Sequence, residues 1–213
     1  MDALDVLTRL RQGDETALRL SMNSVADFFR RGGDLKALVP VLTHSDPRVV
    51  ECGVWIASEV VNAGNGREIF EHLWPLLNHA SPQVRFWAIS GVACLVNRED
   101  TRIVDQLFMR VVDPNPGVRR QALRYLCLVP DSIVESLRGT TSWPSVQLLL
   151  TSARKDEVQS RLRSPALFDQ RMAVAAAMRN FGGDEGFIDE VCHSIDDEVA
   201  EIVPTLPRNR SYS

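Results

Sequence analysis

Apolar residues recur at helical spacing in three segments of the chain. They are Val49, Cys52, Ile56 and Val60, then Val84, Trp87, Gly91 and Leu95, then Val118, Gln121, Tyr125 and Leu128, with Gln121 as the polar exception. Steps of three and four residues fit the helical period of 3.6 and do not fit the alternation of a strand. The pattern therefore predicts three amphipathic helices that each turn these positions toward a core.

The same turn precedes each of these helices, which indicates an internal repeat. Val49, Val84 and Val118 are 35 and 34 residues apart, and each follows a proline by two residues. Proline suits the first helical turn, and an Asp or Ser before it can cap the free amides. Pro40 and Pro75, also 35 residues apart, mark a first helix in each unit. Small residues at Gly53, Ala88 and Ala122 share the helical face of the valines and would let neighbouring helices approach closely.

The leucine-proline first helix, the Asp-Pro turn and the Val-Arg-x-x-Ala second helix resemble HEAT repeats. The resemblance implies a right-handed all-α solenoid of about five to six helix pairs, whose second helices line a concave face that grips another macromolecule. We expect one solenoid domain over residues 1–213. Its predicted parts are two capping helices in 1–33, the best-matching repeats in 34–129, divergent repeats in 130–203 and a tail in 204–213.

The divergent part carries weaker signals. Trp143 to Gln147 predicts the restart of a second helix, and residues 169–178 predict a strong helix closed by a left-handed glycine at 182 or 183. Residues 193–199 are similar to the turn at 44–49. At the other end, two helices are expected before Gly32, with a break at residues 12–14.

Composition and charge narrow the class of protein but do not identify a binding partner. The net charge of −4 disfavours a uniformly basic nucleic-acid binder. No window of about 18 apolar residues predicts a membrane span, and the N-terminus lacks a signal-peptide pattern. The four cysteines form no CxxC pair, so buried reduced thiols and a cytoplasmic location are expected.

No pattern for catalysis, a metal or a cofactor stands out. His44, His79 and His193 are expected in separate inter-helix turns, too far apart to share a zinc ion. The acidic pairs 99–100, 156–157 and 184–185 stand where helices should begin, where carboxylates complement the helix dipole. The chain has no G-x-S-x-G elbow and no phosphate-binding loop. A catalytic site assembled only in three dimensions stays open.

Aligned second helices predict one recognition strip. Offsets of 35 and 34 bring its six positions into register on the concave side: Glu51, Phe86 and Arg120, and one turn further Trp55, Ser90 and Arg124. Trp55 suits either binding or edge packing, whereas Trp74, Trp87 and Trp143 are expected in the core. Residues 101–180 carry a net charge of +5, and residues 181–213 carry −6.

These observations favour a non-enzymatic scaffold, adaptor or inhibitor, such as an immunity-type protein, that binds another protein with an acidic surface. Nucleic acid and membrane partners are not expected, and the oligomeric state stays open. The alternative is a HEAT-like alkylpurine repair glycosylase. Its phosphate contacts would be Arg120, Arg124, Arg154, Arg161 and Arg171. A third possibility is a tetrapyrrole-attaching lyase subunit, for which no chromophore site is recognised.

Overall fold

The chain forms two compact helical units. The computed structural model describes residues 15–62, 64–137, 144–150, 153–195 and 197–207. Clustered contacts divide the chain into Met1–Val96 and Asn97–Ser213. The described residues contain helices and a single isolated bridge between Asn62 and Asn65. The all-α class and the paired helices of a solenoid are thus confirmed, while the single domain over 1–213 stays a prediction.

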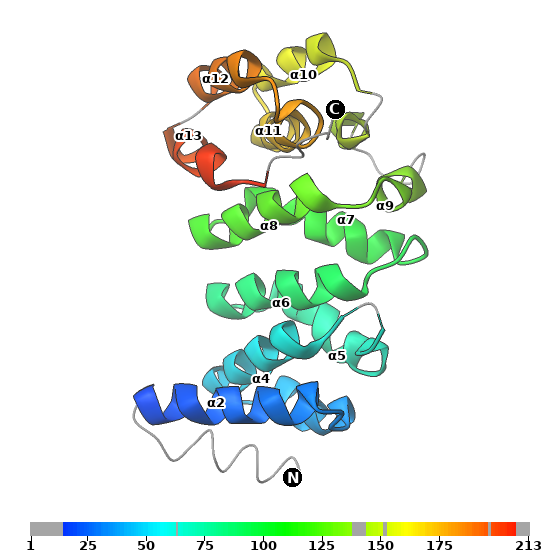
Figure 1. Ribbon diagram of the computed structural model, residues 1–213, viewed down its shortest axis with the longest axis vertical. Coiled ribbons are helices and arrows are strands. Elements are labelled where there is room, and N and C mark those ends of the chain that lie inside the picture. Colours follow the sequence, from blue (N-terminus) through cyan, green and yellow to red (C-terminus); the bar gives the residue numbers. More distant parts are fainter. Residues whose placement is uncertain (1–14, 63, 138–143, 151–152, 196, 208–213) are drawn as a thin grey trace. The chain divides into compact units, whose positions relative to one another are not determined.

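The first unit consists of a capping helix and two helix pairs. Helix α2 (Glu15–Arg30) packs on α4 (Pro47–Val60), and α4 packs on α6 (Pro82–Leu95) (Figure 1). Short segments form the first member of each pair: η1 (Leu35–Leu38) and α3 (Val39–Leu42) before α4, and η2 (Arg67–Ile69), α5 (Phe70–Leu73) and η3 (Trp74–Asn78) before α6. The predicted helices at 49–60 and 84–95 are confirmed.

The second unit contains the remaining pairs. They are α7 (Thr101–Met109) and η4 (Arg110–Val112) with α8 (Pro116–Leu128), α9 (Asp131–Ser136) with η5 (Pro144–Leu149), α10 (Lys155–Leu162) with α11 (Leu167–Phe181), and α12 (Glu185–Ser194) with α13 (Asp197–Ile202), followed by η6 (Val203–Thr205) (Figure 1). The predicted helix at 169–178 is confirmed within α11. The restart expected at Trp143–Gln147 is a short 3-10 helix, and Trp143 itself lies outside the described residues.

Helix α2 ends in a left-handed glycine. Gly32 has φ +98°. Its amide donates to Phe29 at 3.0 Å, and the amide of Gly33 donates to Phe28 at 3.2 Å, the paired bonds of a Schellman motif. The expected glycine end of the capping region is therefore present, whereas the helix predicted before residue 12 lies outside the described residues. At the end of α11 the same expectation is wrong, because Gly182 keeps right-handed helical geometry with φ −60° and Gly183 has no positive φ either.

One side chain closes the turn before four of the second helices, α4, α6, α8 and α11. The Nδ1 atoms of His44 and His79 accept the backbone amides two residues on, at 3.0 and 3.1 Å. In the second unit, Asp113 accepts from Asn115 at 2.9 Å, and Ser164 accepts from Ala166 at 3.2 Å. His44 and His79 are thus turn residues with a structural bond. The expectation for His193 is wrong, since it lies inside α12 and bonds the carbonyl of Asp189.

A second bond returns from the helix to the same turn. The Arg85 guanidinium donates to the carbonyls of His79 and Ala80 at 2.8 and 2.9 Å. Arg119 makes the equivalent bonds to Asp113 and Pro114 at 2.8 and 2.9 Å. Gln170 donates to the Ser164 carbonyl at 2.7 Å, which places Ser164 to Gln170 in the same repeat position. The sequence pattern missed this turn because it has neither the Asp nor the Val-Arg pair.

Small residues on the second helices lie in the cores as predicted. Ala88 and Ala122 are fully buried. A Cβ atom added to Gly53 would lie 2.7 Å from Val41 Cγ1 of the preceding short helix, so the helices of this pair approach too closely for a larger side chain.

The predicted core face of α8 is partly wrong. Gln121 and Tyr125 are only half-buried, and Leu128 is 64% exposed. The buried positions are Val118, Ala122, Leu123, Leu126 and Cys127. Because each helical residue turns by about 100°, Leu128 stands on the opposite side of the helix from buried Leu126.

Candidate functional site

The first unit presents part of the predicted recognition strip. Glu51 and Trp55 lie one turn apart on α4, and Phe86 and Ser90 hold the equivalent places on α6. All four side chains are half-buried, and the residues between them are buried except half-buried Trp87. We call these four residues the unit 1 strip; α4 packs directly on α6, and that the four share one surface stays a prediction.

Glu51 is the unusual charge on this strip. Partial burial raises the pKa of its carboxyl, because the ionised form loses water. The described residues give it no hydrogen-bond or ion-pair partner. The neighbouring carboxylate of Glu59, in contrast, pairs with Arg30 at 3.0 Å. Glu51 therefore offers an acceptor that a cationic or hydrogen-bonding partner could satisfy.

Aromatic side chains on α6 and η3 are partly exposed in the same unit. Phe86 and Trp87 make an edge-to-face contact with ring centroids 4.8 Å apart. Trp74 and Trp87 were expected in the core and are half-buried, and Trp74 donates its indole N–H to Glu71 at 3.2 Å. Partly exposed aromatic rings provide contact area at low entropic cost, which is typical of binding surfaces.

The second unit presents the other predicted positions. Arg120 and Arg124 lie one turn apart on α8, both exposed, and Leu128 continues the same line. Neither guanidinium has a partner among the described residues. We call these three residues the α8 strip. Whether it joins the unit 1 strip in one surface stays a prediction.

The five arginines expected to contact phosphates in a repair glycosylase are not all available for binding. Arg154 pairs with Asp156 at 2.7 Å and Arg161 with Asp169 at 3.4 Å. Arg171 is only 6% exposed and donates to the Val111 carbonyl at 2.6 Å, so the expectation of a phosphate contact there is wrong. Only Arg120 and Arg124 remain accessible without a partner among these candidates.

Buried arginines in α11 have a structural role that the sequence did not predict. Arg179 donates to the carbonyls of Leu149 and Cys127 and pairs with Asp131. Together with Arg171, it satisfies carbonyls near the ends of α8, η4 and η5, where helices leave acceptors without internal partners. A guanidinium suits this role because it presents several donors in a fixed plane.

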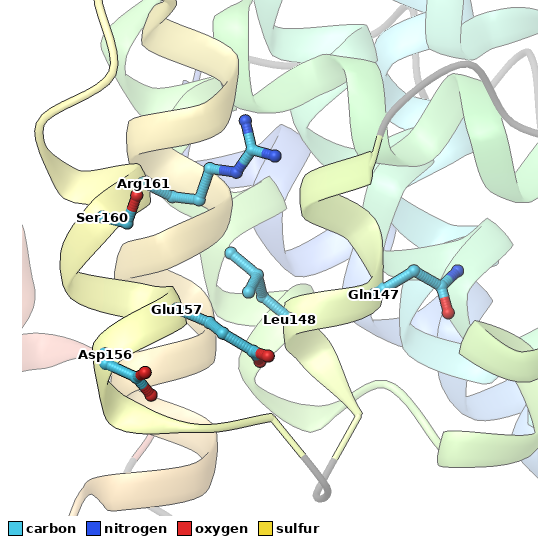
Figure 2. Close-up of a pocket in the computed structure, with 6 residues that line it drawn as sticks. All are labelled: Gln147, Leu148, Asp156, Glu157, Ser160 and Arg161. Atoms are coloured by element: carbon cyan, nitrogen blue, oxygen red, sulfur yellow. The ribbon is translucent and has the colours of Figure 1, made fainter.

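A pocket of about 510 Å³ opens between η5 and α10 (Figure 2). Its lining consists of Gln147, Leu148, Asp156, Glu157, Ser160 and Arg161. The ion pairs of Arg154 and Arg161 already engage part of this charge, and Glu157 accepts the Arg154 backbone amide at 3.1 Å. The lining thus resembles a polar groove at a helix start, with no nucleophile and base in contact.

The acidic pairs and the cysteines named in the sequence analysis have structural surroundings. The acidic pairs stand at the starts of α7, α10 and α12, as predicted, and the Asp184 side chain accepts from the Phe187 amide at 3.0 Å. Burial raises the pKa of Cys52 to about 11 and that of Cys127 to about 12. The prediction of buried thiols is wrong for Cys94, which is exposed. Among the described residues, no group of three His, Cys, Asp or Glu side chains could hold a metal ion.

Solved structures include proteins of similar fold, of which the first supports the fold of this chain. One engineered protein shares 16% sequence identity with this chain at a TM-score of 0.50, over 95% of this chain and 93% of that chain. A designed armadillo repeat protein in complex with the peptide (KR)4 is 15% identical at a TM-score of 0.45, over 96% and 97%. A computationally designed armadillo repeat protein for modular peptide recognition is 15% identical at a TM-score of 0.46, over 95% and 97%.

These likenesses concern architecture alone. No protein-family model matches the chain, and no curated protein matches it. The chain is a helical-repeat protein by fold, while HEAT repeats in particular remain a resemblance of the sequence. Within the described segments, no helix has the length and apolar character that crossing a membrane requires.

Proposed function

We propose that this chain is a non-enzymatic protein-binding scaffold that recognises its partner through the exposed faces of its second helices. The observation that carries the proposal is the unpartnered chemistry on those faces: Glu51 on α4 and two guanidiniums on α8. Neighbouring surface charges such as Arg30 and Arg154 are paired within the chain. Unpaired charges beside partly exposed aromatic rings are suited to a partner's side chains.

An adaptor or inhibitor role, of the kind that an immunity protein has, is the finer form of this proposal. It rests on the small size of the chain and on the continuous side-chain surfaces that stacked helices create. The partner is another protein with an acidic surface, in a cytoplasmic setting. The alternative repair glycosylase has less support, because three of its five expected phosphate contacts are engaged or buried.

The test compares captured proteins from the source cell. Wild-type protein is used as bait beside Glu51→Arg/Trp55→Ala, with Glu68→Arg as the control, since Glu68 is exposed on η2 and outside the strip. We expect specific proteins that the control retains and the double variant loses, with thermal midpoints close to the wild type. Equal capture by all three folded proteins would contradict recognition through the unit 1 strip.

A further inference from the structure

The α8 strip has the geometry of a linear recognition element. Arg120, Arg124 and Leu128 follow one another at four-residue steps on a single exposed face of α8. At 1.5 Å per residue, the strip is about 12 Å long. The opposite face of α8 is buried against α11 and η4. The strip is therefore a rigid row that offers two positive charges and then one apolar side chain.

The two guanidiniums stand one turn apart on one helix, without a carboxylate partner among the described residues. Several other basic groups pair with carboxylates: Arg30 with Asp27 and Glu59, Arg48 with Asp46, Lys155 with Asp184. Exposed Arg98, Arg102 and Arg163 also lack such a pair, but no two of them stand one turn apart within a helix. Like charges four residues apart destabilise an isolated helix slightly. The arrangement thus weakens α8 when nothing is bound, and a carboxylate partner would remove this effect.

Leu128 decides between classes of acidic partner. It is the most exposed of the large apolar side chains in the described chain, at 64%. A leucine in line with the arginines adds little to a contact with phosphates, whereas it can bury area against an apolar side chain. The arginines that could extend a phosphate track, Arg154 and Arg161, are paired with carboxylates.

We propose that the α8 strip binds an acidic amphipathic helix of a partner protein, with carboxylates opposite Arg120 and Arg124 and an apolar side chain against Leu128. A partner helix with the same four-residue step matches the spacing of the strip. Guanidinium groups bind carboxylates through paired hydrogen bonds, which gives the contact direction as well as charge. This inference rests on the proposed scaffold function and specifies the partner's chemistry.

The experiment uses the full chain and a defined probe. The probe is a fluorescein-labelled, alanine-based helical peptide of about 15 residues, with two glutamates four residues apart and a leucine four residues beyond them; a second peptide has the order reversed. Fluorescence anisotropy at low salt should show saturable binding of one of the two peptides, weakened by rising salt because the contacts are charged. Arg120→Glu/Arg124→Glu should lower the affinity at least about tenfold, and Leu128→Ser about threefold or more.

The matched control is Arg98→Glu/Arg102→Glu, which makes the same change of charge at two exposed arginines outside the strip. It should change the affinity by less than about twofold, because long-range effects of exposed charges are small and screened. A short duplex DNA with the same label is measured in parallel. Absence of peptide binding, equal losses in both double variants, no effect of Leu128→Ser, or tighter binding of DNA than of peptide would each overturn the proposal.

These outcomes are separable from failure of the scaffold function. If the peptides do not bind while Glu51→Arg/Trp55→Ala still loses captured proteins, the partner's chemistry at α8 is wrong and the scaffold function stands. If capture is insensitive to the unit 1 variant while the peptide binds through α8, recognition is confined to the second unit.

Discussion

Different residue types form the same hydrogen bond in the turns of successive repeats. His44, His79, Asp113 and Ser164 are chemically different, yet each accepts the backbone amide two residues on. The turn requires an acceptor at a given place rather than a given residue type. This explains why the histidines lie in comparable turns without forming a metal site, and why a motif search passes over Ser164.

The turn acceptor gives the first prediction. His79→Ala should lower the free energy of unfolding by about 0.5–1.5 kcal/mol, the usual contribution of one hydrogen bond. His79→Asp should recover much of the loss, because Asp113 fulfils the same role in the next repeat. Urea denaturation followed by circular dichroism measures both. Equal stability of the Ala and Asp variants would mean that the acceptor atom is unimportant.

Glu51 gives a prediction on pH. Its folded-state pKa is raised above the ordinary value of 4.5 by loss of water, so the ionised carboxyl opposes folding at neutral pH. Glu51→Gln should therefore stabilise the free protein at pH 7, by less than about 1 kcal/mol because the side chain is partly exposed and screened. The gain should vanish below the ordinary carboxyl pKa, where both states are protonated. Thermal midpoints of the two proteins at pH 7 and near pH 3 check this sign.

Whole elements followed the sequence closely where the repeat is regular. Helix α4 matches its predicted core positions, and α6 matches them except at half-buried Trp87, since proline and small residue agree with one another there. The core face of α8 differs from the predicted one. Ala122, Leu123 and Leu126 are buried in place of Gln121 and Tyr125, because they form the more apolar face of the helix. The fourth pair could not be predicted, since tertiary bonds from Arg179 and Asn180 hold the carbonyls of η5.

The register of α6 is testable by one substitution. Ala88 is fully buried, so Ala88→Glu places a charge without a partner in the core of the first unit. The cost is several kcal/mol, and we expect a large drop in thermal midpoint or aggregation. Gln83→Glu is the control, because position 83 is exposed on the same helix. A normal midpoint for the Ala88 variant would show that the register of α6 is different.

At the scale of the molecule, the sequence predicted which positions of the regular repeats are accessible, but it did not predict where that row of accessible positions ends. All six positions of the recognition strip are at least partly accessible, as an aligned repeat should make them. The equivalence of the turns gives Arg171 the same repeat position in α11 that Arg120 has in α8. Arg171 is nevertheless buried, and it donates to the Val111 carbonyl. A fixed offset could not anticipate this, because the short fourth pair lets α11 pack directly on α8.

The last prediction concerns which helices lose stability when one core residue is substituted. Each unit has its own buried core, so we expect destabilisation to stay mainly within the unit that is changed. Arg179→Met removes bonds to Leu149, Cys127 and Asp131 and leaves their acceptors to find water, which should cost about 2–4 kcal/mol. Hydrogen exchange should then accelerate in α8 and α11, while amides of α4 and α6 keep their protection. Exposed Arg163→Met serves as the control and should leave both regions unchanged. Equal acceleration in all four helices would show that the chain unfolds as one cooperative body, and the division into two units would then have no energetic meaning.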